Sequence, residues 1–371
     1  MMAPNRRPLF DIWPRLEPQL GFSPLGEFPT PVEPLSRLVP GLEGWGETFV
    51  KRDDLSSPLY GGNKIRTLEP LLGQARREGR RTVFATGAYG SNHAVATVLH
   101  APRAGLRSGV MLFPQPFSEA ARVNLRVSAT YADEVINLLH WSLLPFAIWR
   151  LARERRGSDG GPMIMPPGGA IPRGCLGFLS GALELAEQID ARALPAPEEV
   201  VLALGSTCSS AGLLVGLRVA ARMGLGFRRG VPPLLVAVRV TPWPVTSPWR
   251  IVHLARRVAG WLHQLTGGPL FRIERAELAR GLEVEGTHLG RGYGRPTDAG
   301  RRAISRLHPF STALDTTYSA KSAAALYDRV RQRPPCARLF WSTKSGAPLP
   351  EVPPERLLRA PTRMLRWLDE A

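Results

Sequence analysis

Residues 51–69 read KRDDLSSPLYGGNKIRTLE, and this stretch decides the fold. The apolar run 48–50 precedes it, and an apolar pattern with helical spacing follows Lys64. Between the two patterns, Gly61 and Gly62 allow the backbone to turn sharply. The stretch therefore predicts a lysine that is presented at the junction of a strand and a helix.

Lysine is rare in this chain, because 44 of the 48 basic residues are arginines. The four lysines are Lys51, Lys64, Lys321 and Lys344. A desolvated lysine can lose its proton and form an imine with an aldehyde, whereas arginine supplies charge without a titrating amine. Each lysine is therefore informative, although a lysine after two glycines also suits an ordinary helix start.

The deciding stretch resembles the signature of a known enzyme family. KRDDL followed by GGNKxRxLE is similar to the motif of the D-cysteine desulfhydrase and 1-aminocyclopropane-1-carboxylate (ACC) deaminase family, and the resemblance runs from about Pro29 to Pro348. These are pyridoxal 5'-phosphate (PLP) enzymes of fold type II, the fold of the tryptophan synthase β chain. The resemblance implies an α/β protein of two lobes, each a mostly parallel sheet flanked by helices, with PLP in the cleft. It also implies that Lys64 carries the PLP imine and that the chain forms a homodimer.

Strand and helix patterns alternate along the chain, with clear strand patterns at 82–86, 108–113 and 200–204. Such alternation argues for parallel sheets that are covered by helices on both faces. The sequence thus predicts the same fold class as the resemblance.

The expected organisation has two lobes and two terminal segments. We expect residues 1–28 to wrap the surface and residues 350–371 to form a peripheral tail. The larger, PLP-binding lobe is expected to comprise 29–70 and 176–349, and the smaller lobe 71–175.

The composition is that of an ordinary globular protein apart from its charge, with 44% hydrophobic residues, 21% charged residues and a formal net charge of +17. The arginines are spread along the whole chain, which indicates a solvated basic surface and argues against a nucleic-acid partner. No apolar run reaches the ~20 residues of a membrane span, so we expect no membrane partner. Cys175, Cys208 and Cys336 show no paired metal-ligand spacing, which predicts no metal site and suits the reducing cytoplasm.

Residues 87–94 read GAYGSNHA and follow the strand pattern at 82–86. Small residues with Ser-Asn at a helix entrance offer N–H groups and a side-chain cap, which by itself suits an ordinary helix N-terminus. The segment resembles the family motif Gly-x-x-x-Ser-Asn-His. This resemblance implies that Asn92 bonds the phenolic oxygen of the PLP ring and that Ser91 touches the substrate carboxylate or assists proton transfer. It gives His93 no catalytic role.

Residues 205–210 read GSTCSS and lie between a buried strand pattern and a helix pattern. Such a loop can aim successive N–H groups and hydroxyls at a phosphate, although a capped helix after a tight turn explains the same pattern. We expect this loop to hold the phosphate of PLP through Gly205, Ser206, Thr207, Cys208, Ser209 and Ser210.

Three residues depart from the family pattern around this phosphate site. Thr207 and Cys208 stand where family members usually have glycine, so their side chains narrow the expected phosphate cup. Thr67 stands where the deaminases tend to place a second lysine. The loss of that cation weakens phosphate binding unless an arginine such as Arg66 compensates.

Two tyrosine motifs and a final strand complete the expected site. Tyr293 lies in a Gly-Tyr-Gly motif, and Tyr318 in a stretch that resembles Asp-Pro-x-Tyr-x-Gly-Lys; in the family both tyrosines line the substrate side, although each also suits a packed aromatic. Residues 340–348 read FWSTKSGAP and resemble Phe-x-His-Thr-Gly-Gly-Ala-Pro, whose threonine faces the pyridine nitrogen. Because this version has an extra residue and no histidine, Thr343 is expected there, with Ser342 or Ser345 as alternatives.

Two positions separate the activities of the family. ACC deaminases carry Glu after the motif tyrosine and Leu in the final motif, whereas desulfhydrases carry Ser and Thr. Ser319 and Thr343 therefore side with the desulfhydrases, and both are expected to bind the cofactor. The leading expectation is a PLP-dependent lyase that β-eliminates a small amino acid such as D-cysteine to pyruvate, ammonia and sulfide. The alternatives are an ACC deaminase that gives 2-oxobutanoate and ammonia, and a catalytically silent PLP-binding relative.

Overall fold

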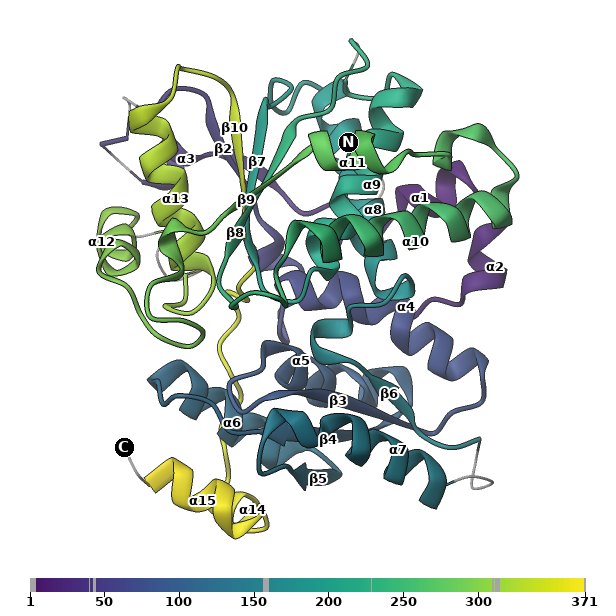
Figure 1. Ribbon diagram of the computed structural model, residues 1–371, viewed down its shortest axis with the longest axis vertical. Coiled ribbons are helices and arrows are strands. Elements are labelled where there is room, and N and C mark those ends of the chain that lie inside the picture. The colour runs from purple at the N-terminus through teal and green to yellow at the C-terminus, as the bar shows by residue number, and fades with distance from the viewer. Residues whose placement is uncertain are drawn as a thin grey trace.

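The computed structural model has an α/β architecture with two sheets, one above the other in Figure 1. Both sheets are mostly parallel and are flanked by helices, as the sequence predicts. The structure describes residues 5–39, 41–42, 45–155, 160–227, 229–308, 310 and 314–369.

The larger sheet has six strands in the order β1-β2-β10-β7-β8-β9. Only β1 and β2 pair antiparallel, and β10, from the end of the chain, lies between β2 and β7. The strands are β1 (Val32–Pro34), β2 (Thr48–Lys51), β7 (Glu199–Leu204), β8 (Leu234–Arg239), β9 (Leu282–Glu285) and β10 (Arg338–Trp341).

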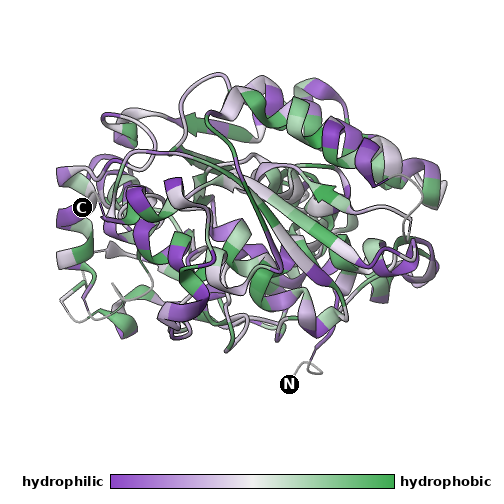
Figure 2. Cartoon of the chain, turned by 90° about the horizontal axis from the view of Figure 1, so that it is seen from below, coloured by the Kyte–Doolittle hydropathy of each residue, from purple (hydrophilic) through white to green (hydrophobic). Residues whose placement is uncertain are grey.

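Helices cover both faces of this sheet because alternate residues of its strands point to opposite sides. In β7, Val200 and Leu202 join one hydrophobic core, whereas Val201 joins another. The first core is covered by α8 (Leu176–Asp190), α9 (Cys208–Met223), α10 (Pro248–Thr266) and α11 (Arg275–Arg280), and the second by α3 (Leu35–Leu38), α12 (Asp298–Arg306) and α13 (Ser319–Gln332). In Figure 2, the strands are largely hydrophobic and the outer helices alternate in hydropathy.

The smaller sheet is entirely parallel, in the order β5-β4-β3-β6. Val83 faces a core under α5 (Asn92–His100) and α6 (Glu119–Tyr131), while the neighbouring Phe84 faces α7 (Leu144–Glu154). The strands are β3 (Thr82–Ala88), β4 (Arg107–Phe113), β5 (Glu134–Asn137) and β6 (Met163–Met165).

Helix α4 (Asn63–Arg77) joins the two halves of the molecule (Figure 1). Its apolar residues Ile65, Leu68 and Leu71 belong to the core of the smaller sheet, while the helix also packs against α8. The expected boundary between residues 70 and 71 therefore falls inside a continuous helix.

Both ends of the described chain are packed against this framework. Helices α1 (Pro8–Ile12) and α2 (Leu16–Leu20) place Leu9 and Leu16 in the core beside α8. The tail forms α14 (Pro354–Leu357) and α15 (Thr362–Asp369) at the edge of the smaller lobe, where Met364 is fully buried. Within the described part of the chain, no helix is both long enough and apolar enough to cross a bilayer.

Candidate active site

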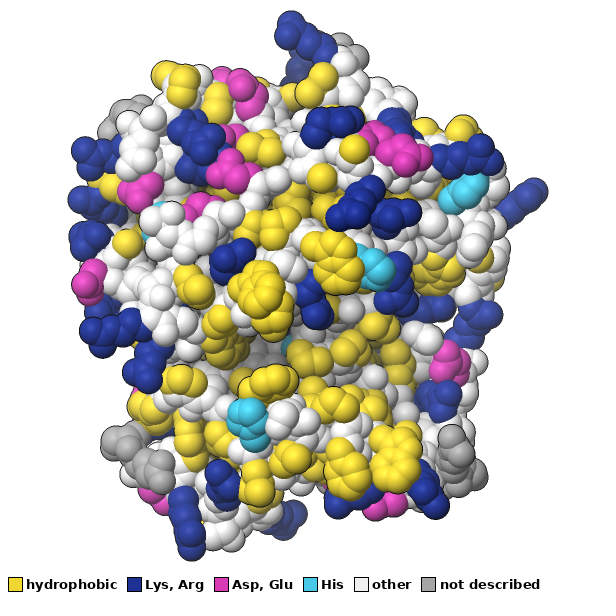
Figure 3. Space-filling model, in the orientation of Figure 1, with side chains coloured by type: hydrophobic (Ala, Val, Ile, Leu, Met, Phe, Trp, Pro, Cys, Tyr) yellow, Lys and Arg dark blue, Asp and Glu magenta, His cyan; other side chains and the backbone are white. Residues whose placement is uncertain are grey.

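The expected site residues come from the carboxyl ends of strands in both sheets. The phosphate loop follows β7, Thr343 follows β10, and Ser91 follows β3 of the smaller sheet. Parallel α/β sheets bind ligands at this edge. Figure 3 shows a hollow between the two lobes with hydrophobic side chains around it.

Lys64 is the second residue of α4. Gly62 precedes the helix with a φ of 80°, and a Cβ there would lie only 2.6 Å from the carbonyl oxygen of Thr343. Glycine thus lets the helix start pack against the end of β10, where the Asn63 N–H donates to the same oxygen at 3.0 Å.

The Lys64 amine makes no hydrogen bond or ion pair with any described residue. Burial lowers the pKa of Lys64, and only the neighbouring Cys208 opposes this effect. A desolvated lysine of this kind holds more of its amine in the neutral, nucleophilic form. Lys64 is therefore suited to bond an aldehyde.

The phosphate loop lies next to this amine. A Cβ at Gly168 would lie 2.2 Å from the Ser206 hydroxyl oxygen and 3.7 Å from the Lys64 Nζ, so the glycine-rich segment 167–169 lies close to both side chains. The structure thus brings Lys64 and Ser206 to one place. The side chain of Asn63 also donates to the Ser209 hydroxyl, at 3.4 Å.

The start of α9 is shaped to hold an anion. Thr207 is the N-cap with a φ of 71°, a left-handed conformation that is costly for a β-branched residue and usual for glycine. The sixteen-residue helix behind it adds positive potential, and the buried Ser210 hydroxyl lacks a hydrogen-bond partner among the described residues. These donors fit the phosphate of PLP.

Two of the three residues that depart from the family pattern, Thr67 and Cys208, pack against each other. Their oxygen and sulfur atoms are 3.8 Å apart, and the Cys208 thiol also lies 3.8 Å from Cys175 and donates to the carbonyl of Gly169 at 3.3 Å. The thiol of Cys208 is thus enclosed by protein atoms. The contact with Cys175 and the charge of Lys64 lower the pKa of Cys208.

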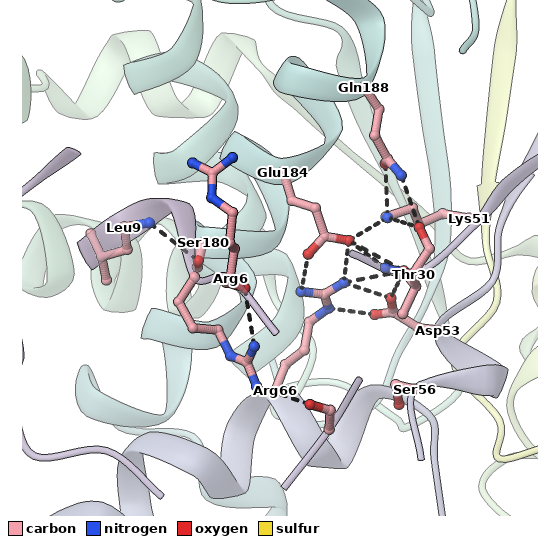
Figure 4. A network of polar contacts seen from close by, with 12 residues as sticks. Arg6, Leu9, Thr30, Lys51, Asp53, Ser56, Arg66, Ser180, Glu184 and Gln188 are labelled. Carbon is pink, nitrogen blue, oxygen red and sulfur yellow. Dashed lines mark hydrogen bonds and ion pairs between the residues drawn. The ribbon is translucent and has the colours of Figure 1, made fainter. Parts of the chain in front are cut away.

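The sequence left open whether Arg66 compensates for the missing cation, and in the structure Arg66 has other partners. It is 1% exposed, and its guanidinium bonds Asp53 at 2.7 and 2.8 Å and Glu184 at 3.0 Å (Figure 4). Glu184 also pairs with Lys51. Because all three guanidinium nitrogens bond these buried carboxylates, Arg66 fixes α4 to α8 and to the turn after β2, and is not directed at the phosphate loop.

Asn92 begins α5 with its amide group locked in orientation. Its Oδ1 accepts from the Tyr60 hydroxyl at 3.0 Å and from the Asn124 amide at 2.8 Å. The Asn92 NH₂ group is therefore left as a donor, as the expected bond to the phenolic oxygen of PLP requires. Ser91 caps the same helix, with its hydroxyl accepting from the Ala94 N–H at 3.2 Å.

His93 is fully enclosed beside Lys64. Neither ring nitrogen has a hydrogen-bond partner among the described residues. Burial, together with the charge of Lys64, lowers the pKa of His93 to about 3. The ring is therefore neutral at physiological pH and lines the site without charging it.

The two expected tyrosines meet each other. The hydroxyl oxygens of Tyr293 and Tyr318 are 2.6 Å apart, and a Cβ at Gly205 would touch the Tyr318 ring at 2.9 Å. The Tyr318 ring thus lies against Gly205, the first residue of the phosphate loop. Burial raises the pKa of Tyr293 to about 12, so its phenol stays protonated at neutral pH.

Ser319 lies behind this pair at the start of α13. It is fully buried, and its hydroxyl accepts from the Asp315 N–H at 2.7 Å. Asp315 in turn accepts from the N–H groups of Thr317 and Tyr318. Ser319 therefore has a local role in shaping the turn that carries Tyr318, and its contact with the cofactor stays a prediction.

Of the three candidate hydroxyls after β10, Thr343 has the most freedom to meet a ligand. The Ser345 hydroxyl accepts from the N–H groups of Gly61 and Ala347. The Ser342 hydroxyl has no hydrogen-bond partner among the described residues, but Ser342 is fully buried beside the Asp54 carboxyl group. Thr343 is 7% exposed and makes no side-chain hydrogen bond with a described residue. This geometry supports the choice of Thr343.

Several residues around the site were not identified from the sequence. Tyr60 orients Asn92 from within the deciding stretch, and Asn124 does so from the middle of α6. Gln115 accepts from the Gly90 N–H at 2.9 Å and lies near Gly294, so it links the Ser91 turn to the loop of Tyr293. An aromatic residue next to two glycines was a usable signal for Tyr60, whereas Asn124 and Gln115 lie in segments without a motif.

A second hollow lies on the opposite edge of the larger sheet, around Ala193 and Pro232. It sits at the amino ends of β7 and β8 and contains none of the expected site residues. Among the described residues, no three His, Cys, Asp or Glu side chains gather as metal ligands.

The chain matches the family model described as "Pyridoxal-phosphate dependent enzyme" over residues 24–335. It is 34% identical to nocardicin C-9' epimerase of Nocardia uniformis subsp. tsuyamanensis over 342 residues, covering 90% of this chain and 97% of the relative. It is 31% identical to D-cysteine desulfhydrase of Salmonella paratyphi C over 312 residues, covering 82% and 87%.

A solved structure described as an ACC deaminase homologue has a TM-score of 0.72 at 24% identity and covers 92% of this chain and 95% of its own. This likeness shows the fold. The family model and the relatives confirm the resemblance and the cofactor that the sequence predicted. The chain therefore belongs to the PLP-dependent enzymes, in the family of the D-cysteine desulfhydrases and ACC deaminases, and its cofactor is pyridoxal 5'-phosphate.

Proposed function

We propose that this enzyme is a lyase that β-eliminates a D-cysteine-like amino acid to pyruvate, ammonia and sulfide. The observation that carries the proposal is the unpaired, desolvated amine of Lys64 beside the start of α9, with Ser319 instead of a carboxylate after Tyr318. The D-cysteine desulfhydrases among the relatives support the same activity.

The proposed mechanism depends on Lys64 as tether and base. When bound, PLP withdraws electrons from the Cα of an attached amino acid. Burial lowers the pKa of Lys64, so its released amine can take the Cα proton near neutral pH. Asn92 and Thr343 orient the ring, and the start of α9 holds the phosphate.

The Tyr293–Tyr318 pair supplies protons on the substrate side. Burial raises the pKa of both phenols, so they act as donors and not as bases. Their hydroxyls share a hydrogen bond of 2.6 Å. One phenol can therefore protonate the departing thiolate while the other phenol holds the first in position through this hydrogen bond. Ser91, at the N-terminus of α5, receives the substrate carboxylate.

The test is product analysis with purified holoenzyme. We expect pyruvate and sulfide from D-cysteine, and little 2-oxobutanoate from ACC. More 2-oxobutanoate from ACC than pyruvate from D-cysteine would replace the proposal with ACC deamination. Normal absorbance of the bound cofactor without product from a panel of D- and L-amino acids would indicate a silent relative.

A second candidate function is epimerisation at Cα, favoured by the 34% identity to nocardicin C-9' epimerase over 90% of this chain. Epimerisation needs the same proton removal by Lys64, followed by return of a proton to the other face. Chiral chromatography of each amino acid after incubation in D₂O separates the two functions. Inverted, deuterated amino acid without pyruvate would support the epimerase.

We also propose a cytoplasmic homodimer. Large exposed aromatic residues follow the carboxyl ends of β5 and β8, among them Trp141 at 63% and Trp243 at 72% exposure. With Phe146, Trp149 and Trp249 they offer on the order of 500 Å² of apolar surface, a substantial part of the ~800 Å² that each partner of a stable pair buries. The three free thiols suit a reducing compartment.

Light scattering on the purified protein tests the assembly. We expect the mass of two chains for the native protein and of one chain for a Trp141→Arg/Trp243→Arg variant. A native protein with the mass of one chain would contradict the dimer.

A further inference from the structure

Three of the four lysines have an assigned place. Lys51 is fully buried and is held by Glu184, by Gln188 at 2.8 Å and by a backbone carbonyl. Lys321 is fully buried and donates to the carbonyls of Leu289 and Gly292 at 2.9 and 3.1 Å, which fixes the loop of Tyr293. Lys64 is the tether of the cofactor. In a chain that otherwise uses arginine for positive charge, Lys344 is left without a role.

Lys344 is partly buried and has few partners. Its Nζ donates to the carbonyl of the next residue, Ser345, at 3.1 Å and lies 5.9 Å from the centre of the Tyr60 ring. No carboxylate of the described residues lies within ion-pair distance, although Asp315 is near enough to oppose the lowering of its pKa by burial. An ammonium group has three donors. At least one donor of Lys344 is therefore free to bind a ligand.

The position of Lys344 puts it in the wall of the active site. The preceding residue, Thr343, accepts a hydrogen bond from the Asn63 N–H at 3.0 Å, next to Lys64. Ser345 accepts from the Gly61 N–H at 2.9 Å. Residue 344 is thus fastened on both sides to the turn that presents Lys64.

The neighbours of Lys344 lie on the substrate side of the site. Tyr60, whose ring centre lies 5.9 Å from the Lys344 Nζ, and Asp315 both influence the Tyr318 phenol electrostatically, and Tyr318 is expected to line the substrate side. The side-chain hydrogen bond that Lys344 makes to a described residue goes to the carbonyl of Ser345 and not to the phosphate loop. A free cation in this place fits an anion that arrives with the substrate better than the phosphate of the cofactor.

We propose that Lys344 is a specificity-determining residue whose ammonium group binds a carboxylate of the amino-acid substrate. The inference rests on the proposed function, since that function defines an amino acid as the ligand. The carboxylate is either the α-carboxylate or a second one on the side chain, and both share the same recognition chemistry. One charge-assisted hydrogen bond is worth about 10- to 100-fold in affinity.

The experiment compares native holoenzyme with Lys344→Met, Lys344→Arg and the control Arg359→Met, which removes one charge from an exposed position outside the site. The substrates are D-cysteine, with one carboxylate, and S-carboxymethyl-D-cysteine, with two. We expect Lys344→Met to raise KM about 10- to 100-fold and to change kcat by no more than about threefold. Lys344→Arg keeps the positive charge, so its KM is expected to stay close to the native value. Arg359→Met is expected to leave both constants unchanged.

The pattern of KM identifies the carboxylate that is bound. An increase for both substrates indicates the α-carboxylate, and an increase for S-carboxymethyl-D-cysteine alone indicates the side-chain acid. Unchanged KM for both substrates would overturn the proposal. A collapse of kcat with unchanged KM in both Lys344 variants would also overturn it, because a proton carrier and not a charge would then be missing.

A binding measurement separates this inference from the proposed function. D-alanine has no leaving group, and D-aspartate adds a second carboxylate, so each can be titrated against the cofactor absorbance without elimination. We expect the apparent Kd of D-alanine, of D-aspartate or of both to be higher in Lys344→Met than in the native protein, while the cofactor content stays native. If native holoenzyme releases no pyruvate but Lys344→Met still has a higher Kd than the native protein, the lyase is refuted and the inference is kept. Identical Kd values in the two proteins would refute the inference.

Discussion

The first turn of helix α4 carries two cationic residues, Lys64 and Arg66, that point to different regions of the molecule. On the Arg66 side, Asp53, Glu184 and Lys51 form a dry network in which every charge has a partner (Figure 4). On the Lys64 side, the described chain offers the amine no partner. A buried charge is costly unless it is paired, so the paired region is framework and the unpaired region is where a ligand completes the structure.

Lys51 and Lys64 show the same contrast between a paired and an unpaired buried side chain, here within one residue type. Burial lowers the pKa of both Lys51 and Lys64. Lys51 bonds Glu184, Gln188 and the carbonyl of Thr30, whereas Lys64 makes no hydrogen bond or ion pair with a described residue. Burial alone therefore does not distinguish a catalytic lysine from a structural one, but the number of partners does.

The largest expected effect is on the unpaired side. Lys64→Ala removes the amine that tethers the cofactor and moves the Cα proton, so we expect kcat to fall at least about 1,000-fold. The visible absorbance of the bound cofactor should be lost, while the free energy of unfolding of the apo-protein changes little. Pyruvate release with native absorbance in this variant would refute the role of Lys64.

The next effect is on the paired side. Arg66→Met leaves Asp53 and Glu184 buried without their shared cation, and we expect the free energy of unfolding to fall by about 3–5 kcal/mol in urea titrations. The matched control is Arg333→Met, whose ion pair with Glu283 is half-exposed and is worth under about 1 kcal/mol. Equal, small losses in the two variants would show that the buried network is not what holds α4 in place.

The pH dependence of stability sharpens the same contrast. Although burial alone would raise it, Arg66 and Lys51 lower the pKa of Glu184 to about 2 from its ordinary value of 4.5. The Glu184 carboxylate therefore contributes its full stability above about pH 4.5 and loses it as the pH falls toward 2, a difference of roughly 3 kcal/mol. Urea titrations across this range should show a flatter pH dependence in Glu184→Gln. Parallel curves for both proteins would contradict the assignment.

The smallest effect concerns backbone strain at the phosphate loop. Thr207 adopts a φ of 71°, which costs a β-branched residue on the order of 1–2 kcal/mol. Thr207→Gly relieves this strain but adds entropy to the unfolded chain, so we expect a net gain of at most about 1 kcal/mol in the apo-protein. A loss of stability would mean that the threonine side chain contributes contacts that outweigh the strain.

The sequence predicted the fold class because its strand patterns are long and regular. The patterns at 108–113 and 200–204 coincide with β4 and β7 to within one residue. The order of the strands was not predicted: β10 enters the sheet between β2 and β7, a pairing between distant parts of the chain that no local pattern encodes.

At the site, motifs with fixed spacing were informative and isolated polar residues were not. The motifs singled out Lys64, the phosphate loop, Tyr293 and Tyr318; in the structure Lys64 and Ser206 lie near the same glycine, and the two tyrosine hydroxyls meet, a contact that the motifs did not predict. Whether Arg66 compensates for the missing cation could not be decided from the sequence, because helical spacing shows which residues are neighbours but not which face meets Glu184 of α8. The orienting bond from Asn124 depends on how α6 packs against α5, which is a tertiary property.

The central claim is that PLP is joined to Lys64, and reduction of the holoenzyme with borohydride followed by peptide mass spectrometry tests it most directly. Because the chain has only four lysines, every possible attachment point can be resolved in one digest. We predict a pyridoxyl-phosphate mass increment on the peptide that contains Lys64 and none on the other three. An increment on Lys344, Lys51 or Lys321, or on no lysine at all, would contradict the account.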